Sequence, residues 1–285
     1  MKNILVTGGA GFIGTNLIKR LLSEGHKVLS IDNYSTGKRE NEQNNCKYYD
    51  IDINNKSIID REEFQNIDAI FHLAALARIH PSLKKPQKSI ETNVNGVLNT
   101  LELARKYNIP FIYAGSSSKH HGLWGSPYAW SKYAGEQLCE LYSKVYNLNT
   151  SICRFYNVYG PHQLETGEYS TVLGIFERQY RNNNPLTITG DGEQRRDFTH
   201  VDDIVDGLYR CMGKNFKAEI FELGRGKNFS INEIADLFKS EKKYIPARNG
   251  EYPFTLCTDT KAHDLLGWNP VLDLEDYIKK VIDND

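Results

Sequence analysis

Residues 2–14 read KNILVTGGAGFIG, and they decide how the rest of the chain is interpreted. The apolar run over 2–7 predicts a buried strand, and the apolar residues of 13–22 recur at helical spacing. Glycines in the turn between strand and helix let the backbone bend sharply and approach an anion, which the free N–H groups of the helix start attract. The pattern predicts a dinucleotide site. Its glycines are Gly8, Gly11 and Gly14.

A carboxylate follows the next predicted strand. The apolar run over 27–31 ends in Asp32, 18 residues after Gly14. A carboxylate at that position accepts hydrogen bonds from the adenosine ribose and repels a 2′-phosphate. We therefore expect NAD rather than NADP, although Asp32 could instead cap a turn, and Lys38 and Arg39 lie nearby.

Apolar runs alternate with helical patterns in the first part of the chain. This alternation predicts a parallel sheet with helices on both faces. The further strands are expected over 47–53, 69–73, 111–114 and 151–155, and the helices over 89–106 and 128–146.

The regular alternation weakens after Gly160-Pro161. We predict an α/β fold, with a Rossmann-type doubly wound parallel sheet in residues 1–161 and a smaller substrate-binding α/β region in 162–285, from which parts near 199–224 return to the first domain. In this second part, helices are expected over 171–180, 201–211, 231–239 and 272–282, and a strand over 219–223.

Composition argues against several classes of partner. The net charge is −1, from 35 basic and 36 acidic residues, so nucleic acid and anionic membranes are not favoured. No apolar run reaches the roughly 18 to 20 residues that span a bilayer. The five cysteines are odd in number and dispersed, which favours reduced thiols in a cytoplasmic protein, and no metal site is assigned.

A tyrosine and a lysine lie one helical turn apart after a helix start signal. Tyr128 and Lys132 occupy positions i and i+4, and Ser116-Ser117-Ser118 ends the fifth predicted strand. A free phenol has a pKa of about 10, which nearby cations lower, so Tyr128 is a candidate general base. The alternative for Tyr128 is a packed aromatic at a helix start.

These motifs resemble those of the extended short-chain dehydrogenases/reductases, in particular the NAD-dependent nucleotide-sugar epimerase/dehydratase family. The resemblance covers essentially the whole chain. It rests also on Asp32–Gly37 (DNYSTG), His72–Ala75 (HLAA), Asn93–Gly96 (NVNG), Arg154–Pro161 (RFYNVYGP), Gly190–Asp203 (GDGEQRRDFTHVDD) and Leu266–Trp268 (LGW).

The resemblance implies roles for these residues. Tyr128 would be the general base and acid, Lys132 would hold the nicotinamide ribose, and Ser117 would bond the reacting hydroxyl, with Ser116 and Ser118 less favoured. Substrate contacts are implied for Ser117, Ser118, Asn157, Arg196, Arg248 and Thr255, the two arginines holding a diphosphate. Cofactor contacts are implied for Gly8, Gly11, Phe12, Ile13, Gly14, Asp32, Asn33, Ser35, Thr36, Gly37, Asp52, Ile53, Leu73, Ala74, Ala75, Asn93, Tyr128, Lys132 and Tyr156, with Asp50-Ile51 as an alternative register to Asp52-Ile53.

The reaction that the resemblance implies is 4-epimerisation of a UDP-hexose or UDP-N-acetylhexosamine. The family's 4,6-dehydratases carry an acidic pair where this chain has Ser118 and Lys119. The alternatives are such a dehydratase, a 4-keto reductase and a non-catalytic NAD-binding module. Thr255 matches a position that gates N-acetyl groups. The family often forms homodimers through two helices, which would be 95–107 and 128–146 here.

The chain departs from the family pattern at His120-His121-Gly122, where the family usually has VYG, and the segment over 118–127 is short. One wall of the sugar pocket is therefore expected to be reduced. For the two histidines, exposed loop positions are favoured over substrate contacts.

Overall fold

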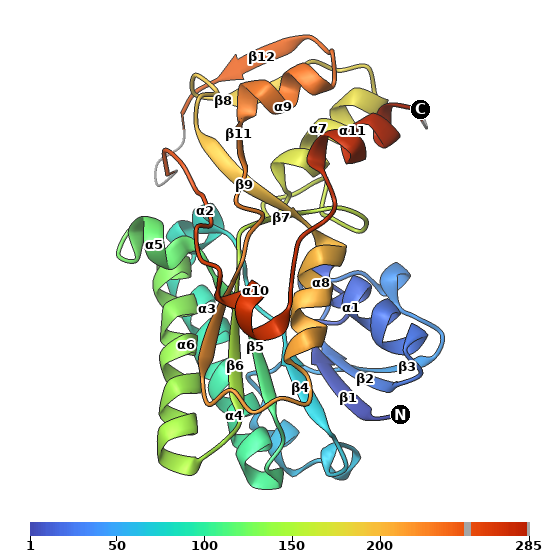
Figure 1. The fold of residues 1–285 in the computed structure, drawn as a ribbon, viewed down its shortest axis with the longest axis vertical. Helices are drawn as coiled ribbons and strands as arrows, with labels where there is room; N and C mark the ends of the chain where they lie inside the picture. The colour runs from blue at the N-terminus through green and yellow to red at the C-terminus, as the bar shows by residue number, and fades with distance from the viewer. Residues whose placement is uncertain (248–251, 284–285) are drawn as a thin grey trace.

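The computed structural model describes residues 1–247 and 252–283, without the side chain of His121. A seven-stranded sheet with flanking helices forms the larger part, and a smaller α/β region lies above the upper edge of this sheet (Figure 1). The predicted fold class is confirmed.

All strand pairs of the large sheet are parallel, in the order β10-β6-β5-β4-β1-β2-β3. The strand order reverses at β1, and sheets of this kind bind ligands at the carboxyl ends of the strands beside such a reversal, here β1 and β4. The strands are β1 (Asn3–Thr7), β2 (Lys27–Asp32), β3 (Cys46–Asp50), β4 (Ala69–His72), β5 (Phe111–Ser116), β6 (Thr150–Phe155) and β10 (Glu219–Leu223).

Helices cover both faces of this sheet. On one face, α1 (Phe12–Ser23) and α8 (Val201–Cys211) share an apolar core that α10 (Lys261–Leu266) also joins. On the other face, α4 (Gly96–Tyr107) and α6 (Pro127–Tyr146) pack on a second core. The connections contain η1 (Arg39–Asn41), η2 (Lys56–Asp60), η3 (Glu62–Phe64), α2 (Ile79–Lys84), α3 (Pro86–Ile90), η4 (Glu91–Asn95) and α5 (Ser118–Gly122).

The helix expected over 89–106 differs from the observed one. The helical path begins earlier, at Pro86, and η4 is a π-helical turn that separates α3 from α4. Within that turn, the side chain of Asn93 bonds to the backbone of Leu76 and to Ser131. A widened turn thus coincides with side-chain bonds to two neighbouring segments, as π-turns at functional sites often do.

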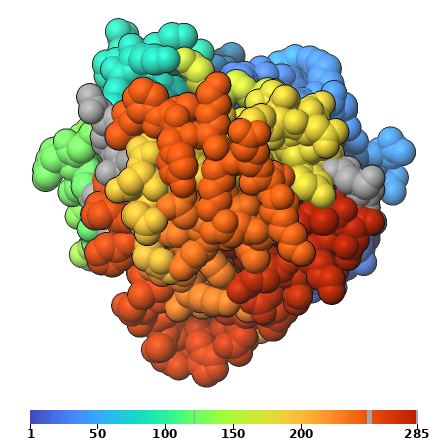
Figure 2. All heavy atoms as spheres, turned by 90° about the horizontal axis from the view of Figure 1, so that it is seen from above, coloured from blue at the N-terminus to red at the C-terminus, as the bar shows by residue number. Residues whose placement is uncertain are grey.

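The smaller region has its own apolar core and covers one end of the molecule. Figure 2 shows this end from above, where the C-terminal residues (orange to red) and residues of α7 (yellow) fill the centre and the N-terminal half appears only at the rim. The region contains β7 (Asn157–Tyr159), β8 (Leu186–Thr189), β9 (Arg195–His200), β11 (Asn228–Ser230), β12 (Lys242–Ile245), α7 (Val172–Arg181), α9 (Ile231–Leu237) and α11 (Leu274–Asp283).

One buried carboxylate joins the two regions. Asp197 on β9 accepts backbone N–H bonds from Arg225 and Gly226, which follow β10, and from Cys257, each 2.9 Å long. Burial raises the pKa of Asp197, against the effect of these bonds. The three N–H groups would lose their acceptor if this side chain were removed.

We expect Asp197→Ala to lower the free energy of unfolding by about 2–4 kcal/mol, because buried N–H groups would be left without partners. Urea unfolding measures this. Asp276→Ala, at an exposed position on α11, should change stability by less than about 1 kcal/mol. Equal stability of the two variants would contradict the role of Asp197.

Candidate active site

The glycine turn is built so that only glycine fits. Gly8 has φ +74°, and a Cβ there would lie 2.8 Å from the backbone nitrogen of Ala74. A Cβ on Gly14 would lie 2.1 Å from the carbonyl oxygen of Gly8. Gly11 caps α1 without a side-chain hydrogen bond, so the first N–H groups of the helix are left for an anion. The turn fits the pyrophosphate of a dinucleotide, with Leu73 and Ala74 packed against it.

Asp32 lies buried at the end of β2. Its Oδ2 accepts from the backbone of Ala10 at 2.9 Å and its Oδ1 from that of Tyr34 at 2.8 Å, while burial raises its pKa. Each carboxylate oxygen has a further lone pair, so ribose hydroxyls can still bond to it. Gly37 packs directly on this carboxylate, since a Cβ there would lie 3.0 Å from both oxygens.

Two cavities adjoin the predicted adenosine side of this site. Ser35 and Thr36 line one of about 560 Å³, together with residues 160–169. Asp52, which accepts a bond of 2.9 Å from Asn33, lines the other, of about 640 Å³. Asp50, in the alternative register, forms an ion pair with Arg39.

Several predicted cofactor residues have packing roles in this structure. Ile53 is buried against Gly96, and Tyr156 against Gly224. Asn93 joins the segment after β4 to α6 through the bonds to Leu76 and Ser131. Phe12 and Ile13 begin α1 and are half-buried, as is Ala75 after β4.

The helix that carries Tyr128 and Lys132 starts where the sequence indicates. Ser126 caps α6 by accepting a bond from the backbone of Ala129, and Pro127 occupies the first turn. Tyr128 therefore stands at the start of the helix, and its own N–H donates to the Ser82 hydroxyl at 3.1 Å. This bond ties α6 to α2.

The serine whose hydroxyl contacts that of Tyr128 is Ser116. The two hydroxyl oxygens of Tyr128 and Ser116 are 3.3 Å apart. Residues 118–122 coil into α5, so the last residue of β5 faces Tyr128, and the bond of Ser117 to the reacting hydroxyl stays a prediction. Ser117 and Ser118 are also buried beside it, and the Ser117 N–H donates to the carbonyl of Phe155.

Charges around Tyr128 act on its pKa in opposite directions. Burial raises the pKa of Tyr128, whereas the Ser116 bond and the charge of Arg78 lower it. Burial also lowers the pKa of Lys132 to about 8, although Glu136 one turn further raises it. The Lys132 ammonium lies 4.4 Å from the centre of the Tyr113 ring. Arg78 is therefore the cation that favours the Tyr128 phenolate in this structure.

Arg78 was missed by the sequence analysis. It caps α2 and donates from Nε to the carbonyl of Tyr169 at 3.1 Å, so it reaches from the sheet to the segment after β7. It forms no ion pair with a carboxylate in the described ranges, 1–247 and 252–283. The feature of the sequence that could have indicated Arg78 is its position a few residues after β4, at the carboxyl edge of the sheet.

The predicted substrate residues lie mostly on the smaller region. Asn157 donates to Thr255 Oγ1 and to the carbonyl of Asp197, both at 3.1 Å, and Thr255 is buried. Arg196 is half-buried on β9. Tyr252 packs over Gly122 and is close enough to Tyr128 and Arg196 for their charges to act on its pKa. Arg248 lies outside the described residues.

Comparison with known proteins gives the family. A model of the "NAD dependent epimerase/dehydratase family" matches residues 4–224. The chain belongs to this family. A UDP-glucuronate 4-epimerase of Thermodesulfobacterium geofontis is 35% identical, and the match covers 98% of this chain and 94% of that protein. A UDP-glucose 4-epimerase of Mycolicibacterium smegmatis is 32% identical, and the match covers 98% of this chain and 97% of that protein. The crystal structure of UDP-glucose 4-epimerase from Thermotoga maritima, solved with UDP-glucose, has a TM-score of 0.93, 33% identity and coverage of 99% and 97%.

Membership of the NAD-dependent epimerase/dehydratase family makes NAD the cofactor and the protein an enzyme. The glycine turn and Asp32 are the residues that fit this cofactor.

The charge of Arg78 should be visible in the pH dependence of the reaction. Its guanidinium favours the Tyr128 phenolate, so removing the charge raises the pKa of that phenol. We expect Arg78→Gln to move the acid limb of the kcat/KM profile to higher pH, and Arg78→Lys to move it less. Arg210→Gln, at an ion pair with Asp206, is the control. An unmoved limb in Arg78→Gln would show that this charge does not act on the base.

Proposed function

We propose that the protein is a nucleotide-sugar 4-epimerase that acts on a UDP-hexose or UDP-N-acetylhexosamine through a transient 4-keto sugar. The observation that carries this proposal is the bond between the Tyr128 and Ser116 hydroxyls at the sheet edge, one helical turn from Lys132. This arrangement suits removal of a proton from a sugar hydroxyl.

Each side chain has a defined task in that reaction. Tyr128 takes the proton of the C4 hydroxyl and later returns it, while Ser116 bonds the same hydroxyl and orients it. Arg78 favours the phenolate form of Tyr128, and Lys132 would hold the nicotinamide ribose. NAD, which the glycine turn and Asp32 would hold, would supply a reversible hydride acceptor for C4 of the sugar.

Epimerisation is favoured over water elimination by the groups beside Ser116. Ser118 and Lys119 occupy the positions of the acidic pair, and the Lys119 ammonium lies over the Tyr133 ring. The nearby buried carboxylates, Glu136 and Glu222, are both ion-paired with Arg154. A carboxylate held in this way is a poor acid or base.

Substrate binding is assigned to the smaller region. We propose that Asn157, Arg196 and Arg248 hold the diphosphate, since guanidinium groups form paired bonds with phosphate oxygens. Thr255, which lies against Asn157, would leave room for a 2-acetamido group.

We also propose a homodimer through α4 and α6. Both helices expose apolar side chains, which solvent-facing helices seldom gather on one surface. These are Leu98, Leu141, Val145 and Tyr146. Leu138 of α6 packs instead against the core.

For the cellular location we propose the cytoplasm, because the five cysteines are free thiols in this structure. Within residues 1–247 and 252–283, no helix combines the length and the apolar character needed to cross a bilayer.

The proposed base is tested by Tyr128→Phe, with UDP-glucose, UDP-galactose and their N-acetyl forms followed by NMR. We expect the wild type to interconvert a pair and the variant to lose about 10²- to 10⁴-fold in kcat, as expected when a general base is removed. Tyr146→Phe, exposed at the end of the same helix, should keep full activity. A 4-keto-6-deoxy product, or full activity of Tyr128→Phe, would overturn the proposal.

For the dimer, Leu141→Glu combined with Val145→Glu should give a monomer by light scattering, because charges would face an apolar contact. Val271→Glu, at another exposed apolar position, should leave the mass unchanged. A wild type of monomer mass would rule out this assembly.

A further inference from the structure

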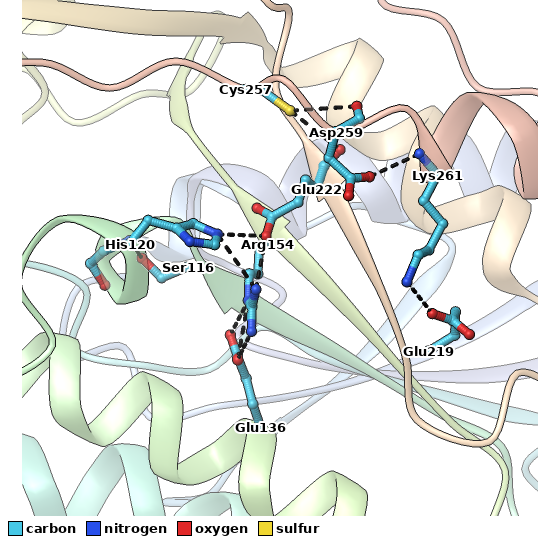
Figure 3. A network of polar contacts seen from close by, with 10 residues as sticks. Ser116, His120, Glu136, Arg154, Glu219, Glu222, Cys257, Asp259 and Lys261 are labelled. Carbon is cyan, nitrogen blue, oxygen red and sulfur yellow. Dashed lines mark hydrogen bonds and ion pairs between the residues drawn. The ribbon is translucent and has the colours of Figure 1, made fainter.

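A cluster of four charged or titratable side chains lies behind the catalytic residues, and it joins four elements (Figure 3). Arg154 on β6 is at its centre. Its Nε and Nη2 bond to the Glu136 carboxylate at 2.7–3.1 Å, and its Nη1 bonds to Glu222 on β10 at 2.8 Å. His120 on α5 reaches the same Glu222 oxygen with Nε2, at 2.7 Å.

The direction of the His120 bond follows from its partner. Arg154 and His120 lower the pKa of Glu222, which is therefore an ionised carboxylate and can only accept. The Nε2 atom of His120 must then carry the hydrogen. Of the four side chains, those of Arg154, Glu136 and Glu222 are 5%, 2% and 7% exposed, whereas His120 is 39% exposed. His120 is thus the outer group that fastens α5 to a buried cluster.

Glu222 needs the hydrogen-bond donor that His120 supplies. Two nitrogens of the Arg154 guanidinium bond to Glu136, and only Nη1 bonds to Glu222. Buried carboxylates need hydrogen-bond donors, since water does not reach them. Glu222 Oε2 has no partner among the residues described, which leaves its other oxygen to hold both Arg154 and His120.

The position of α5 matters because it sets the Ser116 hydroxyl. The N–H of Ser118, at the start of α5, donates to Ser116 Oγ at 3.2 Å. That bond occupies a lone pair of the oxygen and turns its remaining groups toward Tyr128, 3.3 Å away. The cluster is also connected to the active site through α6, because Glu136 follows Lys132 by one turn of this helix.

We propose that His120 is a positioning residue of the active site: through its bond to Glu222 it fixes α5, and α5 in turn holds Ser116 against Tyr128. The expected effect on kcat rests on the proposed function. The attachment of α5 rests on the contacts of His120 and Ser118 alone. It gives His120, in the short segment between β5 and α6, a role other than substrate contact.

Three variants test the role of His120. His120→Gln places an amide N–H where Nε2 donates, so we expect kcat to stay within about 3-fold of wild type. In His120→Ala, α5 loses its bond to Glu222, and we expect kcat to fall about 10- to 100-fold with KM changed less than about 3-fold, as for a small displacement of a reacting group.

The double variant His120→Ala/Glu222→Gln separates positioning from stability. Replacing Glu222 removes the carboxylate that His120→Ala leaves short of a donor, so the melting temperature should recover. The kcat should not recover, because α5 still lacks its bond to the cluster. Recovery of both, or equal loss in His120→Gln and His120→Ala, would overturn the proposal.

Amide hydrogen exchange over residues 116–122 gives a readout that needs no turnover. We expect faster exchange in His120→Ala, and wild-type exchange in His120→Gln. If wild type epimerises no UDP-sugar while this difference is present, the proposed function fails and the attachment of α5 stands. If His120→Ala exchanges like wild type, the attachment is refuted whatever the activity.

Discussion

The hydroxyl groups of Tyr128 and Ser116 lie 3.3 Å apart because a strand ends and a helix begins at the same edge of one parallel sheet. Ser116 ends β5, and Tyr128 begins α6, which returns along the sheet. The glycine turn and Asp32 lie at the carboxyl ends of β1 and β2, on the other side of the strand-order reversal. Parallel pairing therefore gathers the glycine turn and the proposed catalytic pair at one edge, and the smaller region covers it.

Burial has opposite effects on the two groups of the catalytic helix. It raises the pKa of the Tyr128 phenol and lowers that of the Lys132 ammonium to about 8. Burial alone therefore favours the neutral form of each group, whereas a general base must be present as the phenolate. Ser116 and Arg78 work against this at Tyr128, and Glu136 does so at Lys132. The buried Arg154 cluster thus supports the chemistry through Glu136 as well as through α5.

Features encoded in short stretches of sequence could be predicted, and features that depend on chain path could not. The glycine turn and Asp32 were found because their spacing is local, and the long strands because they are continuous apolar runs. The contact of Ser116 with Tyr128 was not predicted, since helix α5 determines which serine faces Tyr128. Arg78 and the contacts of Glu222 with His120 join segments far apart in sequence, which no spacing rule brings together.

The central claim, that Tyr128 acts on a C4 hydroxyl whose hydride leaves and returns, is tested most directly by isotope tracing. UDP-glucose or UDP-N-acetylglucosamine carrying deuterium at C4 is incubated with the purified enzyme in ordinary water, and the product is read by NMR and mass spectrometry. The account predicts an epimer that keeps the deuterium at C4. An epimer with hydrogen at C4, or one with deuterium retained but formed at the wild-type rate by Tyr128→Phe, would contradict it.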